Sequence, residues 1–303
     1  MSVSVRGVTK LYGAQKALDN ISFEVKSGEI VGFLGPNGAG KSTMMKIITG
    51  FMPPSSGNVL VNDIDVGNDN IEIRKKIGYL PENNPLYPDM FIREYLGFVA
   101  SVYKMGSSGR KAINEIIEVT GLIPEQNKKI GALSKGYRQR VGLAQALIHN
   151  PEVLILDEAT SGLDPNQIVE IRNLIKEAGR KKTVLFSTHI MQEVEAICDR
   201  IIIIDRGIIK ADEAKNNIYS RLHGTVQTIT VEFDRAPDET ILRNILNVKN
   251  VLHLKDNLWQ IESDGRDDIR PQIFSFAVAN KLTVLSLQKK QNNLEEVFRH
   301  LTN

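Results

Sequence analysis

The sequence predicts an α/β fold with a mostly parallel central sheet, followed by a small α+β domain. Short segments rich in Val, Ile and Leu alternate with segments of helical periodicity as far as residue 215. Strands that are apolar on both faces are typical of a parallel sheet covered by helices on each side. Beyond residue 215 the first strand pattern alternates with period two, which indicates a second domain with a half-exposed sheet.

The first domain, residues 1–215, contains four expected buried strands and the helices that connect them. The strands are expected at residues 29–34, 153–157, 183–188 and 200–205, and the helices at residues 41–49, 136–149, 166–180 and 191–198. An antiparallel β subdomain is expected at the N-terminus and around residues 57–61, where strands are short and turn residues are frequent. A helical subdomain completes this domain.

The second domain is expected at residues 225–303, after a linker at residues 216–224. Its strands are expected at residues 225–233, 248–254, 258–261 and 282–287, and its helices at residues 238–246, 267–281 and 294–301. This βαββαβα order is typical of a ferredoxin-like α+β domain. The domain has no recognisable catalytic motif, and we expect it to brace or regulate an assembly of the chain.

Composition excludes several classes of protein. With 38 Lys and Arg against 36 Asp and Glu, the net charge of +2 argues against a nucleic-acid-binding surface or a polybasic membrane anchor. Cys198 is the single cysteine, so a reducing compartment and a buried, unreactive thiol are expected. The first residues lack the apolar stretch of a signal peptide, and no apolar run approaches the ~18 residues that span a bilayer.

Residues 35–43 match the phosphate-loop pattern G-x-x-x-x-G-K-[ST] between an expected strand and an expected helix. Glycines let successive backbone N–H groups surround phosphate oxygens, and the helix N-terminus adds a partial positive charge. A plain glycine-rich turn is the alternative, but the strand and helix favour a P-loop NTPase that binds a nucleotide and Mg²⁺. The predicted nucleotide-binding residues are Gly35, Pro36, Asn37, Gly38, Ala39, Gly40, Lys41, Ser42 and Thr43. Lys41 is expected on the β- and γ-phosphates, and Ser42 on Mg²⁺.

Two acids, Asp157 and Glu158, follow the expected strand at residues 153–157. The carboxyl end of a parallel strand lies beside the phosphate loop in such a sheet. Asp157 is therefore a predicted Mg²⁺ ligand, and Glu158 a predicted general base for the attacking water. The alternative is a solvated turn, where acids are also common.

These motifs and the stretch between them resemble the ATP-binding subunits of ABC transporters over about residues 1–215. The segment from Leu133 to Arg140 is similar to the family's LSGGQ signature, and residues 161–164 to its D-loop. The resemblance implies that two copies, or this chain and a homologue, pair head to tail around two ATP molecules. It further implies that Ser134 and Gly136 bind the γ-phosphate held by the opposite subunit. His189 would contact the γ-phosphate and order the attacking water, and Tyr12 would stack on adenine.

The chain departs from the family pattern at three positions. Glu82 stands where the family has a glutamine that binds Mg²⁺, so a carboxylate ligand with an added negative charge is expected. Lys135 and Tyr137 replace Gly and Gln in the signature. Lys135 is expected either to place positive charge near the γ-phosphate or to point into solvent.

The resemblance also predicts the biological setting. Branches that export drugs or lipids are similar at these positions, and residues 77–90 and 293–298 are similar to gliding-motility-associated ATP-binding subunits in particular. Residues 89–102 are where the family docks a permease, although their apolar side chains also fit a helical core. We therefore expect an ATPase dimer that powers a separate permease at the inner face of the cytoplasmic membrane. The alternatives are an ATPase of translation or DNA repair without a permease, and a nucleotide-dependent scaffold with weak hydrolysis.

Overall fold

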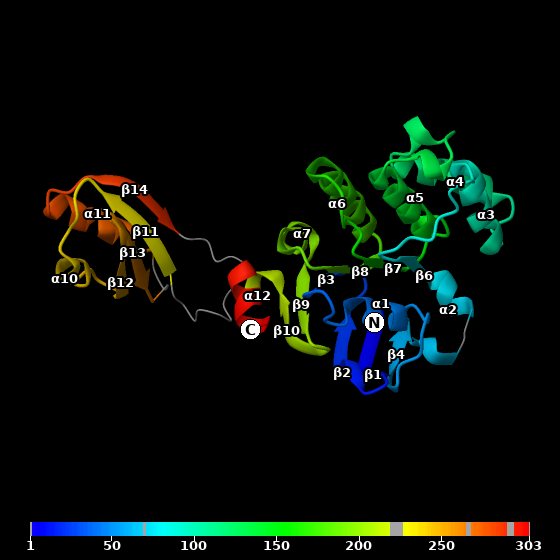
Figure 1. The fold of residues 1–303 in the computed structure, drawn as a ribbon, viewed down its shortest axis with the longest axis horizontal. Coiled ribbons are helices and arrows are strands. Elements are labelled where there is room, and N and C mark those ends of the chain that lie inside the picture. The colour runs from blue at the N-terminus through cyan, green and yellow to red at the C-terminus, as the bar shows by residue number, and fades with distance from the viewer. Residues whose placement is uncertain (1, 69–70, 219–226, 265–267, 290–293, 303) are drawn as a thin grey trace. The chain divides into compact units, whose positions relative to one another are not determined.

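The computed structural model describes residues 2–68, 71–218, 227–264, 268–289 and 294–302. The chain divides into two compact units, one of residues 1–215 and one of residues 216–301. Figure 1 shows their elements, and each unit is considered by itself. Among the described residues, no helix has both the length and the apolar character that a membrane span needs.

The first unit is built on a six-stranded sheet, in which β3, β6, β7, β8 and β9 run parallel and β10 pairs antiparallel with β9. Its order is β10-β9-β3-β8-β7-β6. The strands are β3 (Ile30–Leu34), β6 (Ile77–Leu80), β7 (Val153–Asp157), β8 (Thr183–Thr188), β9 (Arg200–Asp205) and β10 (Ile208–Ala214). Every residue of β3, β7 and β8 is buried, which explains why their central residues are apolar. The predicted α/β fold with a mostly parallel sheet is confirmed.

A four-stranded sheet of order β2-β1-β4-β5 forms the predicted antiparallel subdomain. Its strands are β1 (Val3–Tyr12), β2 (Gln15–Val25), β4 (Ser56–Val61) and β5 (Ile64–Asp65). Helix α1 (Lys41–Ile48) contributes Met44 and Ile47 to an apolar core that also contains residues of both sheets. The helix that follows the phosphate loop is thus fixed by packing against both sheets.

The remaining helices of the first unit include a helical subdomain of α3, α4 and α5, seen together in Figure 1. The helices are α2 (Ile71–Lys76), α3 (Ile92–Val102), α4 (Ser108–Val119), α5 (Lys135–Leu147), α6 (Pro165–Gly179) and α7 (Met191–Ile197). Helix α8 (Lys215–Ile218) spans the boundary between the two units in the sequence. Short 3₁₀ helices occupy Val66–Asn68, Ile123–Glu125 and Ile130–Ala132. Cys198, just after α7, is free and buried, as predicted.

The second unit contains an antiparallel sheet of order β12-β13-β11-β14, the order of a ferredoxin-like domain. Its elements are β11 (Gln227–Phe233), α10 (Glu239–Leu242), β12 (Val248–Lys255), β13 (Leu258–Ser263), α11 (Arg270–Ala279), β14 (Val284–Lys289) and α12 (Leu294–Thr302). Phe233, Trp259 and Ile273 are among its buried core residues. The predicted helix at residues 238–246 was too long, since α10 ends at Leu242. Of the predicted linker, residues 216–218 belong to α8, and residues 219–224 lie outside the described residues.

Candidate nucleotide-binding site

The phosphate loop runs from the end of β3 to the start of α1 and has a backbone that requires glycine. Gly38 and Gly40 have φ angles of +80° and +105°, which L side chains rarely adopt. A Cβ on Gly40 would lie 2.5 Å from the carbonyl oxygen of Ala17, and a Cβ on Gly35 2.4 Å from that of Ile204. The loop therefore fits closely against β2 and β9, in the conformation that the motif predicts.

Lys41 lies at the base of this loop and is only 5% exposed. Its Nζ donates to the carbonyl oxygens of Gly35 at 2.9 Å and Pro36 at 3.1 Å. The same ammonium lies 3.2 Å from Oε1 of Glu158. A buried cation needs such partners, and together they hold the charge at the point where the loop would receive phosphate.

Asp157 and Ser42 supply a cluster of oxygen atoms next to the loop. Ser42 Oγ donates to Oδ1 of Asp157 at 3.1 Å, and Ser187 Oγ donates to the same oxygen at 2.5 Å. Burial raises the pKa of Asp157, the two hydroxyl donors oppose this effect, and the nearby Glu158 carboxylate adds to it. A hard divalent cation prefers carboxylate and hydroxyl oxygens, so this donor set fits Mg²⁺.

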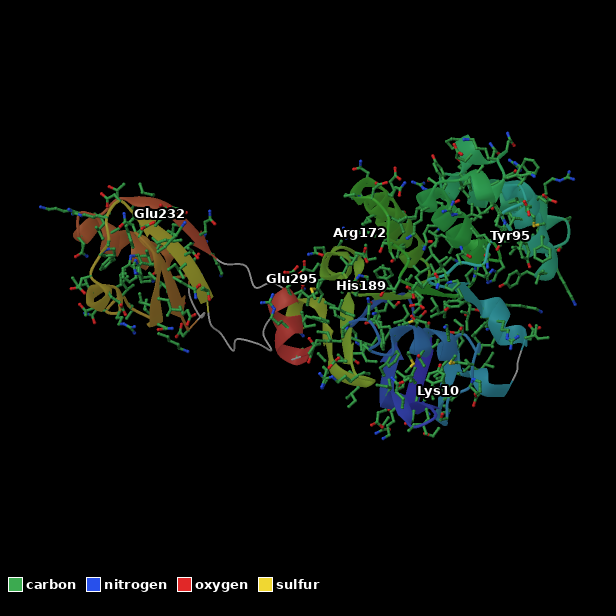
Figure 2. The ribbon with its side chains drawn as sticks, in the orientation of Figure 1. Lys10, Tyr95, Arg172, His189, Glu232 and Glu295 are labelled. Atoms are coloured by element: carbon green, nitrogen blue, oxygen red, sulfur yellow. The ribbon has the colours of Figure 1, made fainter. Side chains whose placement is uncertain are left out.

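Glu158 is 6% exposed and turns away from β7 with a φ of +50°, which is unusual for a non-glycine residue. Its backbone N–H lies within hydrogen-bond distance of both the carbonyl and the hydroxyl oxygens of Ser187. Its Oε2 lies 2.8 Å from Nδ1 of His189, which follows β8 and is labelled in Figure 2. Backbone strain of this kind is common at functional sites, and here it brings the carboxylate between Lys41 and His189.

Sequence reasoning missed Ser187, which contacts both acids of the site. The residue is fully buried at the end of β8, and the parallel register places it opposite Asp157. The signal that could have found it is a hydroxyl at the carboxyl end of an apolar strand, next to the strand that carries the acids.

A cavity of about 610 Å³ unites most of the predicted nucleotide site. Tyr12, 48% exposed, lies at the end of β1 with its hydroxyl 3.2 Å from Sδ of Met52. The residues that line this cavity are Tyr12, Gln15, Lys16, Ala17, Asn37, Gly38, Gly40, Lys41, Ser42, Thr43, Glu82, Glu158 and Arg206. Gly35, Pro36 and Ala39 belong to the same loop but do not line the cavity. The structure thus brings the expected adenine-stacking residue and the phosphate loop to one cavity.

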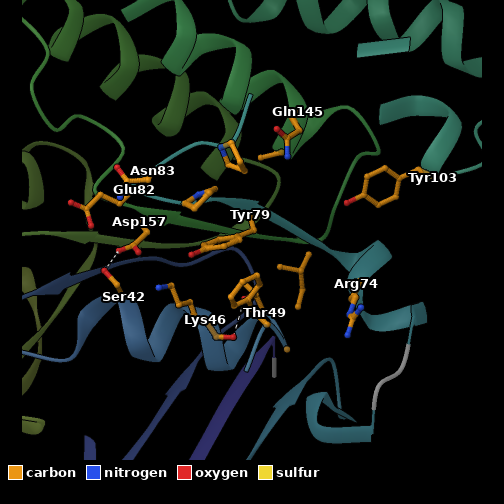
Figure 3. Close-up of a pocket in the computed structure, with 16 residues that line it drawn as sticks. Ser42, Lys46, Thr49, Arg74, Tyr79, Glu82, Asn83, Tyr103, Gln145 and Asp157 are labelled. Carbon is orange, nitrogen blue, oxygen red and sulfur yellow. Dashed lines mark hydrogen bonds between the residues drawn. The ribbon is translucent and has the colours of Figure 1, made fainter. Parts of the chain in front are cut away.

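Glu82 is exposed and also borders a second cavity of about 630 Å³, shown in Figure 3. Ser42 and Asp157 lie at the same end of this cavity. Burial raises the pKa of the Tyr79 hydroxyl, and the negative charges of Asp157 and Glu82 raise it further. Glu82 is therefore close to the predicted Mg²⁺ ligands, as its sequence position predicts.

The signature segment, residues 133–137, does not line the phosphate-loop cavity. Ser134 is the N-cap of α5, and its Oγ accepts a hydrogen bond from the backbone N–H of Tyr137 at 3.3 Å. Gly136 is buried where a Cβ would lie 2.5 Å from the Gln167 side chain on α6. Neither Ser134 nor Gly136 lines the phosphate-loop cavity of its own chain.

Comparison with known proteins places these observations in a family. A family model described as "ABC transporter" matches residues 18–161, which include the phosphate loop, the signature segment and both acids. The linearmycin resistance ATP-binding protein LnrL of Bacillus subtilis (strain 168) is 35% identical, over 99% of this chain and 98% of its own. The bacitracin transport ATP-binding protein BcrA of Bacillus licheniformis is 31% identical, over 98% of this chain and 95% of its own.

Solved structures agree with this relationship. The dimeric, post-hydrolysis structure of the ATP-binding cassette MJ0796 bound to ADP and Pi has a TM-score of 0.65 and 31% identity, and covers 70% of this chain and 98% of that one. A structure described as an ATP-binding subunit of an ABC transporter has a TM-score of 0.67 and 30% identity, and covers 74% of this chain and 94% of that one. The chain belongs to the ATP-binding subunits of ABC transporters, ATPases that are coupled to transport.

Proposed function

We propose that this chain hydrolyses ATP in a head-to-tail dimer and so powers a separate membrane permease. The observation that carries the proposal is the convergence of Lys41, Glu158 and His189 beside the phosphate loop, where Glu158 contacts both of the other side chains. Each has the chemistry that phosphoryl transfer to water requires: a cation for phosphate, a base for water, and a group that orients the base.

Glu158 is the proposed general base. Its carboxylate accepts a proton from the attacking water, while contact with His189 at 2.8 Å holds it in place. Ser42, Asp157 and Glu82 would hold Mg²⁺, which neutralises phosphate charge when bound. Ser187 acts as a positioning residue, because it donates to Asp157 and its backbone fixes that of Glu158.

The partner in the dimer is a second copy or a homologous subunit. Ser134 and Gly136 do not line their own chain's nucleotide cavity, so we propose that they complete the site of the partner. The serine hydroxyl and the N-terminus of α5 suit an anion. ATP would then favour the closed dimer through contacts made only in that state, and hydrolysis would release it.

The cavity in Figure 3 is the proposed permease-docking surface, although none of residues 89–102, where the resemblance placed the docking, lines it. Its lining includes Phe51, which is 73% exposed, together with Arg74, Tyr103 and Gln145. Tyr103 stacks on His149 with ring centroids 3.9 Å apart, which favours this position of its ring. The other end of the cavity is bordered by Ser42 and Asp157, which gives a docked helix a direct route to the nucleotide site. We place the chain on the inner face of the cytoplasmic membrane through this contact.

The proposed cargo is a drug or a lipid. Two relatives carry names that refer to linearmycin resistance and bacitracin transport, and both align over nearly the whole chain. A role in gliding motility stays a narrower prediction that rests on residues 77–90 and 293–298 alone.

The test is a steady-state ATPase assay with Mg²⁺ on the purified chain and on Glu158→Gln. The variant is expected to bind ATP, to turn over about 10²–10⁴-fold more slowly, and to accumulate as a dimer in light scattering. Glu177→Gln, which changes an exposed acid on α6, is the matched control and should behave as wild type. Unchanged turnover in Glu158→Gln would contradict the general-base role.

Phe51→Ser tests the permease contact separately. It should leave ATPase activity intact while reducing the amount of membrane protein that co-purifies from detergent extracts. Wild-type levels of the co-purified permease would contradict this docking surface.

A further inference from the structure

The turn between β9 and β10 carries Arg206 to the rim of the nucleotide cavity. We propose that Arg206 is a further nucleotide-binding residue, whose guanidinium binds the phosphate groups of ATP and ADP at the open edge of the cavity. The proposal rests on the proposed function, since it assumes that the phosphate loop binds nucleotide.

The conformation of the turn is costly for arginine. Arg206 and Gly207 have φ angles of +48° and +75°, and the flanking residues Asp205 and Ile208 are paired across the hairpin. Two successive residues with positive φ in a two-residue loop are typical of a type I′ turn, which favours Asn, Asp or Gly at the first position. A longer side chain there costs about 1–2 kcal/mol. The residue at this position is therefore not the one that the turn itself prefers.

The turn is also fixed against the phosphate loop. The N–H of Gly207 donates to the carbonyl oxygen of Ala39 at 3.0 Å, and its own carbonyl accepts from the N–H of Asp19 at 2.8 Å. A Cβ on Gly207 would lie 2.7 Å from the carbonyl oxygen of Ala17. These contacts join the turn to both β2 and the loop, so the backbone of Arg206 is fixed relative to the phosphate loop.

Arg206 is the cation of the cavity lining that is least engaged by the protein. Its side chain is 86% exposed, and its Nε lies 3.8 Å from Oδ2 of Asp205. Lys41 is buried among its partners, and Lys16 is paired with Asp19 at 3.1 Å. A guanidinium can donate two parallel hydrogen bonds to a phosphate group.

The charge balance of the cavity adds a reason for this cation. Glu82 and Glu158 both line the cavity, and Glu82 is a carboxylate where the family pattern has a neutral glutamine. Nucleotide phosphates must therefore approach an additional negative charge. Arg206 lies on the same lining and offsets that charge, which Lys16 and Lys41 already do in part.

The test compares Arg206→Asn with wild type by competition against a fluorescent ADP analogue. Asn suits positive φ, so the variant should be at least as heat-stable as wild type. ADP affinity should nevertheless fall roughly fivefold at low salt, the loss should shrink as salt is raised, and adenosine affinity should not change. A structural role alone would not separate stability from affinity in this way. Arg180→Asn, which removes an exposed, ion-paired arginine outside the cavity, is the matched control.

The outcomes separate the two proposals. If wild type binds ADP and Arg206→Asn binds it equally well at low salt, the role of Arg206 is wrong and the proposed function stands. An equal loss for adenosine would also overturn it, because the phosphates would then play no part. If the wild-type chain binds neither ATP nor ADP, both proposals are wrong.

Discussion

The phosphate-loop half and the signature half of the proposed site are built differently. Lys41, Asp157 and Glu158 are buried and joined by contacts within one chain. Ser134 and Lys135 are exposed at the start of α5, where the Ser134 hydroxyl accepts a hydrogen bond from its own helix. The first half is therefore ordered before any partner arrives, whereas the second half presents groups to one. Substitutions in the phosphate-loop half should change properties that a single chain has by itself, such as its ATP affinity. Substitutions in the signature half should act mainly by changing how the dimer forms.

The largest effect is expected from Asp157→Asn. Loss of a Mg²⁺ ligand should lower turnover by about 10³-fold, corresponding to about 4 kcal/mol. The same variant should nevertheless be more stable to unfolding than wild type at neutral pH. Burial raises the pKa of Asp157 in the folded chain, so the ionised carboxylate lowers the stability of the fold at any pH above that raised pKa. This loss of stability disappears when the pH falls below about 4, the pKa of an aspartate in the unfolded chain.

Thermal melts of Asp157→Asn and wild type across pH measure this prediction. The variant should melt at a higher temperature at pH 7, and the difference should shrink as pH falls toward about 4. A variant that is less stable at pH 7 would show that the carboxylate is net stabilising.

Lys41→Ala is expected to weaken ATP binding roughly 100-fold, through loss of a charge-assisted contact worth about 3 kcal/mol. The effect belongs to a single chain, so it should appear in dilute protein that does not dimerise. Calorimetric titration with ATP measures it, and Lys26→Ala, an exposed lysine between β2 and β3, is the control. Binding at wild-type strength would contradict the phosphate assignment.

Sequence patterns predicted the half of the site whose parts are local. The phosphate loop, α1 and the Asp157-Glu158 pair are each specified by a few consecutive residues, and all were found. Ser187 and Arg206 were missed because their roles depend on the register of β8 with β7 and on a turn packed against the phosphate loop. Strand β10 was missed because its sequence is half polar at the edge of the sheet, and β6 because it has four residues.

Ser134→Ala addresses the signature half. It removes the hydroxyl that caps α5, so each chain should lose about 1 kcal/mol of stability. ATP binding by the dilute chain should be unchanged, because Ser134 does not line that cavity. ATP-induced dimerisation in the Glu158→Gln background, followed by light scattering, should require a higher protein concentration. A change in ATP affinity of the single chain would break the division between the two halves.

The smallest effect is expected from Lys135→Ala. The side chain is exposed and does not line the nucleotide cavity of its own chain, and its Nζ lies 2.1 Å from where a Cβ on Gly162 would be. An exposed cation in such a place is screened, so stability should change by less than about 0.5 kcal/mol.

Gly162→Ala should be more costly than Lys135→Ala, by about 1–2 kcal/mol, mainly because Gly162 has a φ of +67°. The new Cβ would also meet the end of the flexible lysine side chain, which adds a smaller steric cost. In a double-mutant cycle by chemical denaturation, Lys135→Ala should recover the steric part of that loss and leave the φ part. Additive effects would show that the two side chains do not meet. A double mutant that loses less stability than the sum of the two single losses would instead establish a contact between the signature and the D-loop within one chain. The signature half would then be held in place by its own subunit through Lys135 as well as through Gly136, which packs against Gln167.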